Sequence, residues 1–222
     1  MRNRFSADHQ HLLTCGNVLL DKILFDIPKT ILLYGEAAVG KTNIVLDIIK
    51  RSIRALELNN MIAVYVSTEG SCYVDRVIQL GIESANIVFV EAYSLDHTLH
   101  LVSYIFATIP RIALLAIDSI NNFYRAEAGD VRSSIVFSSI LTILKALAAA
   151  YNVYIIATAQ VRQQELGEVE PSGIKFLVEW ADVIARIERR GRLRKFIVEK
   201  PVSREFEFVI HDCGIEWILE EQ

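Results

Sequence analysis

Eight residues that follow a short apolar run have the types and spacing that bind phosphate. The pattern Gly-x-x-x-x-Gly-Lys-Thr is met by Gly35-Glu36-Ala37-Ala38-Val39-Gly40-Lys41-Thr42. Its two glycines allow backbone torsions that turn successive amide N–H groups toward one anion. Lys41 supplies a cation for the outer phosphates of a nucleotide, and the Thr42 hydroxyl is a ligand for Mg²⁺. We therefore expect residues 35–43, including Asn43 in the first helical turn, to bind nucleotide.

A carboxylate at Asp118 follows a strongly apolar run. The run, residues 113–117, has a composition typical of a strand buried on both faces. Ligands of open parallel sheets bind at the carboxyl ends of the strands, where such an aspartate holds Mg²⁺, usually through water. The alternative is that Asp118 caps a helix or a turn. Because the phosphate loop is present, we favour a metal site formed by Thr42 and Asp118.

Two further polar residues, Glu69 and Gln160, stand where apolar runs end. Glu69 would orient or deprotonate the attacking water if its strand lies beside the phosphate-loop strand or that strand's neighbour. Gln160 would sense the γ-phosphate and pass its state to residues 161–171. Each pattern alone is weak, because a strand-end glutamate is more often solvated. With Lys41, these two residues are the candidate catalytic groups.

The elements that must position these residues alternate between strand and helix. We expect strands at 30–34, 61–67, 86–90, 112–117 and 153–158, and helices at 41–58, 73–80, 94–108 and 132–151. This alternation predicts an α/β fold with a mostly parallel sheet and helices on both faces.

The last quarter of the chain has a different pattern. Residues 183–188 and 193–199 flank Gly191 as a hairpin would, and 205–210 and 214–219 have the composition of short strands. We expect one domain over residues 1–222. It would comprise an arm and lead-in helix (1–25), a phosphate-loop core (26–180) and an antiparallel C-terminal β extension (181–222).

Composition excludes several classes of protein. The chain has 222 residues, a net charge of −4 and three widely spaced cysteines, so neither a globally basic nucleic-acid binder nor a disulfide framework is expected. Residues 133–160 are apolar, but Lys145 and several serines interrupt them, whereas a spanning helix needs about 20 nearly unbroken apolar residues. Residues 1–10 lack an apolar signal core. We expect a cytoplasmic, nucleoid-associated protein without a membrane span.

The order of the motifs resembles the ATPase core of the RecA/RadA recombinase superfamily. That order is Gly35 to Thr42, Thr68-Glu69-Gly70, Leu115-Ala116-Ile117-Asp118-Ser119 and Thr158-Ala159-Gln160-Val161. The similarity extends over roughly residues 10–218. Thr14-Cys15-Gly16 and residues 20–24 look like the family's lead-in segment. Residues 123–127 look like the entry to its first DNA-binding loop, and residues 171–173 like the exit of its second.

The resemblance implies particular roles, cofactors and partners. ATP and Mg²⁺ would be the ligands, Glu69 the catalytic glutamate and Gln160 the γ-phosphate sensor. Arg76 falls where the family has an adenine-stacking side chain, although it also fits an exposed helical arginine. The family's archaeal recombinases carry an N-terminal helix-hairpin-helix domain and a Phe-x-x-Ala polymerisation motif, whereas Phe5-Ser6-Ala7 has a different spacing. The chain therefore resembles a core-only archaeal RadA paralogue of the RadB or RadC kind, a monomer or small oligomer rather than a filament.

Basic residues mark candidate contacts with single-stranded DNA. In the loop regions Glu127 and Asp130 offset Arg125 and Arg132, and three glutamates outnumber Arg162, so these loops are not basic. A second group clusters around Gly191, with only Glu188 opposing it within the segment: Arg186, Arg189, Arg190, Arg192, Arg194 and Lys195. This group is either a nucleic-acid surface or a solvated hairpin tip.

Two functions remain open. The first is a slow ATPase that assists RadA recombinase or other repair proteins on single-stranded DNA. The second is an ATP-switched protein-binding module with negligible turnover and no direct DNA binding. A signalling ATPase of the KaiC type, or a small-molecule kinase, ranks below both, because the chain has no second core and no Arg-rich lid.

Overall fold

One continuous sheet organises the molecule. The computed structural model describes residues 12–127, 129–161 and 173–218, and their strands run in the order β3-β2-β4-β5-β1-β6-β7-β8-β9. The strands from β3 to β6 in this order pair in parallel, and β7, β8 and β9 continue the sheet in antiparallel pairing. The strand bounds are β1 Thr30–Gly35, β2 Ile62–Ser67, β3 Ile87–Glu91, β4 Ile112–Asp118, β5 Tyr154–Gln160, β6 Val183–Arg190, β7 Leu193–Lys200, β8 Arg204–His211 and β9 Gly214–Ile218.

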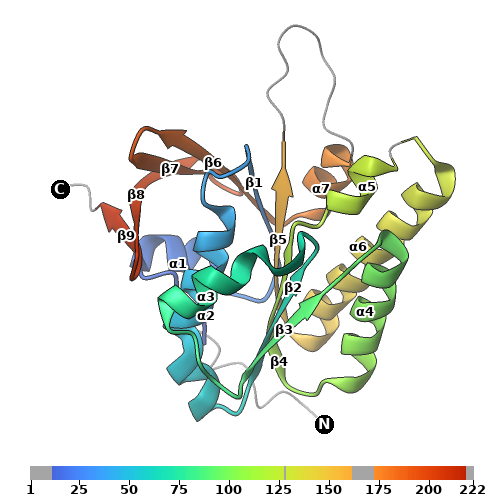
Figure 1. The fold of residues 1–222 in the computed structure, drawn as a ribbon, viewed down its shortest axis with the longest axis horizontal. Helices are drawn as coiled ribbons and strands as arrows, with labels where there is room; N and C mark the ends of the chain where they lie inside the picture. The colour runs from blue at the N-terminus through green and yellow to red at the C-terminus, as the bar shows by residue number, and fades with distance from the viewer. Residues whose placement is uncertain (1–11, 128, 162–172, 219–222) are drawn as a thin grey trace, which may run out of the picture.

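Helices cover both faces of the parallel part (Figure 1). In β1, Ile31 and Leu33 belong to the core on the side of α2, whereas Leu32 belongs to the core on the side of α6. Side chains alternate along a strand, so a strand covered on both faces is apolar at every position. The helices are α1 Val18–Leu24, α2 Lys41–Leu58, α3 Val74–Leu80, α4 Leu95–Thr108, α5 Asn122–Ala126, α6 Val131–Tyr151 and α7 Ile174–Trp180, with a short 3₁₀ helix at Gly70–Tyr73.

The predicted α/β fold with a C-terminal antiparallel extension is confirmed. The expected strands and helices all occur, with ends that differ by a few residues at most. Strand β6 pairs in parallel with β1 and in antiparallel fashion with β7, so it joins the core to the extension. The sequence reading missed α5 and α7, which have five and seven residues. Helices this short carry too few turns for a periodic pattern.

Helix α6 is long and apolar enough to cross a membrane by length and composition alone. Its side chains Phe137, Ile140 and Leu144 are buried in the core that it shares with α4 and β5. A core helix of this kind passes the same test, so α6 is weak evidence for a membrane span.

The last strand is fastened to α2 and to the start of the described chain. Buried Asp47 on α2 accepts hydrogen bonds from Ile215 N (3.1 Å) and from Arg51 Nε (2.6 Å). The indole nitrogen of Trp217 donates to the carbonyl of Cys15 at 2.7 Å. Strand β9 therefore holds the helix that follows the phosphate loop.

Candidate nucleotide site

The carboxyl ends of β1, β2, β4 and β5 meet at one edge of the sheet, at the top in Figure 1. The phosphate loop connects β1 to α2 there, with left-handed torsions at Ala38 (φ 60°) and Gly40 (φ 111°). Helix α2 begins directly at Lys41, so its N-terminal amides face the loop. A cradle of amides between a strand end and a helix N-terminus fits an anion such as a nucleotide phosphate.

The ammonium of Lys41 lies inside this loop. Its Nζ donates to the carbonyl oxygens of Gly35 (2.9 Å) and Glu36 (2.7 Å), and the residue is 6% exposed. Burial lowers the pKa of Lys41, whereas the carboxylates of Asp118 and Glu69 act in the opposite direction. An ammonium has three donors, so one remains for an anion in the cradle.

Asp118 connects the loop to the centre of the sheet. Its Oδ2 accepts from Thr42 Oγ1 at 2.5 Å and from Tyr65 OH at 2.6 Å, and its Oδ1 accepts from Thr158 Oγ1. A carboxylate that meets a hydroxyl beside a phosphate cradle is the oxygen donor set that Mg²⁺ takes, with phosphates completing its shell. Among the described residues, no group of three or more His, Cys, Asp or Glu side chains is placed to hold a metal ion.

Sequence reasoning missed Tyr65 and Thr158. Both belong to the strands that flank β4, and both hydroxyls hold Asp118. Burial and the neighbouring Asp118 raise the pKa of Tyr65 well above its usual range, so it remains a neutral donor. Nothing in the local sequence of Tyr65 marks this role, because the contact depends on strand order.

Glu69 reaches the site in a way that differs from the expected one. Strand β2 lies between β3 and β4 and is beside neither β1 nor a neighbour of β1, so the condition set on strand order is not met. Side chains span the distance instead. Glu69 Oε1 accepts from Ser119 Oγ at 2.9 Å and from Gln160 Nε2 at 2.8 Å. The candidate glutamate and the candidate sensor are therefore in direct contact.

Arg125 lies at the same end of the sheet. From α5 its Nη1 donates to Gln160 Oε1 at 3.3 Å, and its charge contributes to the lowered pKa of Lys41. The amide of Gln160 thus lies between a cation on one side and the Glu69 carboxylate on the other. This residue, expected to contact DNA, is oriented toward the nucleotide site.

The family follows from a comparison with known proteins. A family model described as Rad51 matches residues 9–178. The chain belongs to the Rad51 family. Among curated proteins, "DNA repair and recombination protein RadB" of Methanococcus maripaludis strain C7 is 31% identical over 178 residues, with 76% of this chain and 80% of the relative covered. The RadB proteins of Halobacterium salinarum strain R1 (29%; 94% and 96%) and Thermococcus sibiricus (28%; 92% and 95%) match over nearly their whole lengths. The chain is a RadB-like member of the RecA/RadA superfamily, as its motif order predicts.

Arg76 is held by the turn between β8 and β9. Its Nη2 donates to the carbonyl of His211 at 2.7 Å, and its Nη1 donates to the carbonyl of Asp212 at 3.2 Å. Among buried side-chain nitrogens and oxygens of the described residues, Arg76 Nε is the one without a hydrogen-bond partner. The arginine is therefore partly buried and anchored rather than freely exposed, and adenine stacking stays a prediction.

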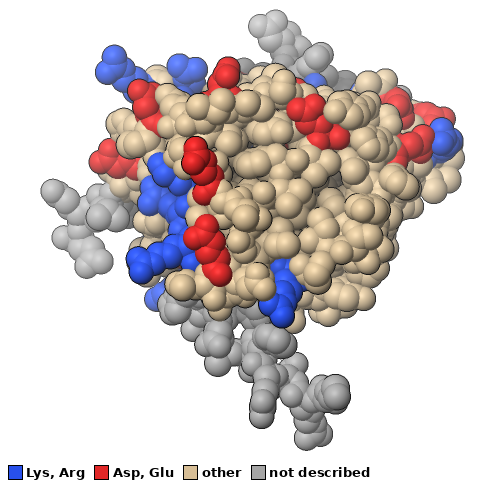
Figure 2. All heavy atoms as spheres, turned by 60° about the horizontal axis from the view of Figure 1, so that its bottom comes forward, with Lys and Arg blue, Asp and Glu red and all other residues tan. Residues whose placement is uncertain are grey.

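The basic hairpin is less positive in three dimensions than in sequence. Glutamates from β6, β7 and β8 pair with its cations: Arg186 with Glu188 and Glu199, Arg190 with Glu188, and Lys195 with Glu205 and Glu207. Glu188 is the only acid within the segment, but antiparallel pairing brings Glu199, Glu205 and Glu207 from outside it alongside the cluster. Figure 2 turns the bottom of Figure 1 toward the viewer, and on that face a group of Lys and Arg side chains at the left lies beside Asp and Glu side chains.

The remaining candidate DNA contacts have separate environments. Arg132 on α6 donates to Asp96 Oδ2 at 2.9 Å on the surface, and Arg162 lies outside the described residues. Arg189 and Arg192 are exposed at the hairpin tip, where Arg189 Nε donates to the carbonyl of Gly191. Arg194 instead donates from Nε to the carbonyl of Val39 in the phosphate loop at 3.1 Å. Local sequence gives no signal for that contact.

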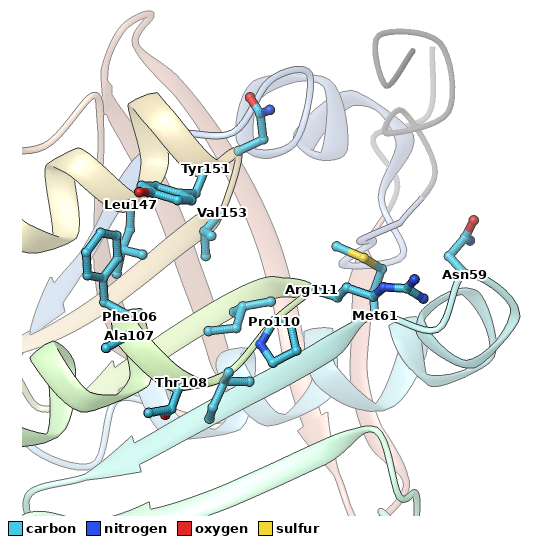
Figure 3. Close-up of a pocket in the computed structure, with 13 residues that line it drawn as sticks. Asn59, Met61, Phe106, Ala107, Thr108, Pro110, Arg111, Leu147, Tyr151 and Val153 are labelled. Atoms are coloured by element: carbon cyan, nitrogen blue, oxygen red, sulfur yellow. The ribbon is translucent and has the colours of Figure 1, made fainter. Parts of the chain in front are cut away.

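A hollow lies at the opposite end of the parallel strands (Figure 3). Its volume is about 660 Å³, and it is lined where α4 and α6 end and where β4 and β5 begin, by residues that include Phe106, Pro110, Arg111 and Tyr151. It contains none of the candidate site residues, so the nucleotide site is not this pocket.

Proposed function

We propose that this chain is an ATP-binding, Mg²⁺-dependent and slow ATPase that assists a RadA-type recombinase in homologous recombination and DNA repair. The observation that carries the proposal is the hydrogen bond of 2.5 Å between Thr42 Oγ1 and Asp118 Oδ2, which joins the phosphate loop to a strand-end acid. Such a pair beside an anion cradle suits a nucleotide with its Mg²⁺. RadB relatives in three genera are named as DNA repair and recombination proteins, which supports the role in recombination. This role implies a cytoplasmic, nucleoid-associated protein.

The site residues divide the work of phosphoryl transfer. The amides of residues 36–42 and the Lys41 ammonium bind and orient the phosphates, while Thr42 and Asp118 hold Mg²⁺, which supplies charge neutralisation. Glu69 Oε1 accepts both hydrogen bonds from its neighbours, which orients the other carboxylate oxygen as a base for water. The Glu69 side chain is exposed to solvent in the part of the chain that the structure describes. Bulk water is therefore poorly excluded from the site, and we expect slow turnover of ATP.

A comparison of ATP turnover tests this assignment. We expect Lys41→Ala to lose nucleotide binding, and Glu69→Gln to keep binding but lose turnover by about 10²-fold or more. The matched control is Glu91→Gln, because Glu91 ends the neighbouring strand β3. Equal phosphate release by wild type and Glu69→Gln would remove the catalytic role of Glu69. Failure of the wild type to bind ATP would refute the proposal itself.

The alternative is an ATP-switched protein-binding module without turnover or DNA contact. The ion pairs that neutralise Arg186 and Lys195 favour it, because affinity for nucleic acid comes largely from unpaired cations. A proposed contact with single-stranded DNA thus falls on Arg189 and Arg192 at the hairpin tip, since Arg190 also pairs with Glu188.

A salt titration of DNA binding separates these two functions. We expect Arg192→Glu to weaken binding of single-stranded DNA and to reduce the slope of log K against log salt by about one. Arg54→Glu, an exposed arginine on α2 with the same charge change, is the control. Equal curves for both variants would favour the protein-binding module.

A further inference from the structure

The β6–β7 hairpin contacts the phosphate loop through one side chain. Arg194 lies on β7, and its Nε donates to the carbonyl oxygen of Val39 at 3.1 Å. Its Nη1 donates to the carbonyl of Arg192 at 3.1 Å, within its own hairpin. The guanidinium therefore links two backbone segments, one in the hairpin and one in the loop that binds phosphate.

The loop is packed tightly against the strands at this point. A Cβ atom added to Gly40 would lie 2.6 Å from Ile210 Cδ1 on β8, and 3.5 Å from Arg194 Cδ and Nε. Real Cβ atoms do not approach carbon as closely as 2.6 Å, so Gly40 leaves room for the end of the Ile210 side chain, while Arg194 lies at an ordinary contact distance. Burial, and next the charge of Arg189, lower the pKa of Arg194, which agrees with its half-buried position.

The contact has a consequence for the peptide plane between Val39 and Gly40. Within the described chain, the cis peptide bonds are Asp118–Ser119 and Lys200–Pro201, so the Val39–Gly40 bond is trans. In a planar trans peptide the C=O and N–H groups point in opposite directions. When Arg194 holds the Val39 carbonyl toward β7, the Gly40 N–H points away from β7. In the strand order, β4, which carries Asp118, lies on the opposite side of β1 from β7.

We propose that Arg194 is a positioning residue for phosphate binding. It fixes the Val39–Gly40 peptide so that the Gly40 N–H stays directed at the anion in the cradle. This inference rests on the proposed function, because it concerns the same nucleotide. It also moves Arg194 from the predicted DNA surface to the nucleotide site, whereas Arg189 and Arg192 remain at the exposed tip.

An isosteric pair of substitutions tests the hydrogen bond. In Arg194→Gln the amide nitrogen stands at the same number of bonds from Cα as Arg Nε, so a neutral donor to Val39 is kept. Arg194→Met has a similar length and no donor. Arg192→Met is the matched control, since Arg192 is exposed on the same hairpin. Affinities for ATP and ADP with Mg²⁺ would be measured by titration calorimetry, together with the midpoint of thermal unfolding without nucleotide.

We expect Arg194→Met to bind ATP about tenfold more weakly than the wild type, from the loss of one hydrogen bond to a charged donor. Arg194→Gln and Arg192→Met should stay within about threefold, and all variants should unfold at similar temperatures without nucleotide. Unchanged affinity in Arg194→Met would overturn the inference. Equal losses in the Gln and Met variants would also overturn it, because charge or general packing would then be responsible. A wild type that binds no ATP would instead refute the proposed function.

Discussion

Removal of one hydroxyl, in Tyr65→Phe, tests how Asp118 is held. Tyr65 is 1% exposed, and its OH donates to Asp118 Oδ2 at 2.6 Å. A hydrogen bond to a charged group contributes about 1.5–3 kcal/mol. Asp118 keeps the hydroxyls of Thr42 and Thr158, so we expect a loss of about 2 kcal/mol in the free energy of unfolding, below the upper end of that range.

The comparison variant is Tyr154→Phe, which also removes a buried tyrosine hydroxyl. Tyr154 OH donates to the neutral carbonyl of Phe25 at 3.0 Å, and a bond between neutral groups contributes about 1 kcal/mol. The charged acceptor at Asp118 therefore predicts about twice the loss for Tyr65→Phe. For a chain of this size the two losses correspond to about 4–8 °C and about 2–4 °C in the unfolding midpoint.

Urea unfolding followed by circular dichroism, without Mg²⁺ and nucleotide, measures both losses. The reasoning would be refuted if Tyr65→Phe lost no more stability than Tyr154→Phe. Such a result would mean that the two threonine hydroxyls satisfy Asp118 fully. We further expect Tyr65→Phe to weaken Mg²⁺-dependent binding of ATP, because a less constrained carboxylate is a poorer ligand.

Three further predictions concern pH, the loop and its lysine. Burial raises the pKa of Tyr154 to about 12, above the ordinary value of about 10. Between these pH values the folded state keeps a proton that the unfolded state loses. The free energy of unfolding should therefore fall as the pH rises from about 10 to 12. In Tyr154→Phe this dependence on pH, measured by urea unfolding, should be smaller. In Gly35→Ala, the new Cβ would lie 2.4 Å from the carbonyl oxygen of Ile187. We expect the free energy of unfolding, measured in the same way, to fall by about 2 kcal/mol or more. A fall within about 0.5 kcal/mol would contradict this packing. Lys41→Met removes a buried ammonium, so calorimetry should detect no ATP binding. The midpoint of thermal unfolding without nucleotide should stay unchanged or rise, because burial of a charge is costly. A large fall in that midpoint would mean that the hydrogen bonds of Lys41 to the loop carbonyls outweigh the cost of burying its charge.

The parts of the fold that depend on local pattern were predictable from the sequence. Apolar runs with polar ends marked the strands, and the loop motif marked the start of α2 at Lys41, which the structure confirms. Asp118 could be expected beside Thr42, because carboxyl ends of parallel strands share an edge. These are properties of single segments and of a general rule of parallel sheets.

The parts that depend on strand order were not predictable. Tyr65 contacts Asp118 because β2 lies beside β4, and Glu69 meets Gln160 across β4. Glutamates on β7 and β8 neutralise Arg186 and Lys195 because the extension folds back in antiparallel fashion. Charge counts within one segment cannot include partners that lie 10 or more residues away.

The bond between Trp217 and Cys15 brings the two ends of the described chain side by side. Chains whose ends lie together at the surface tolerate circular permutation. A gene rearranged so that a short linker follows β9 and leads into the segment before α1, with new ends opened at the Gly191 turn, would produce the same nine-stranded sheet. Because that cut leaves the loop between β1 and α2 intact, a reporter protein could be inserted at the hairpin tip to follow nucleotide binding by fluorescence.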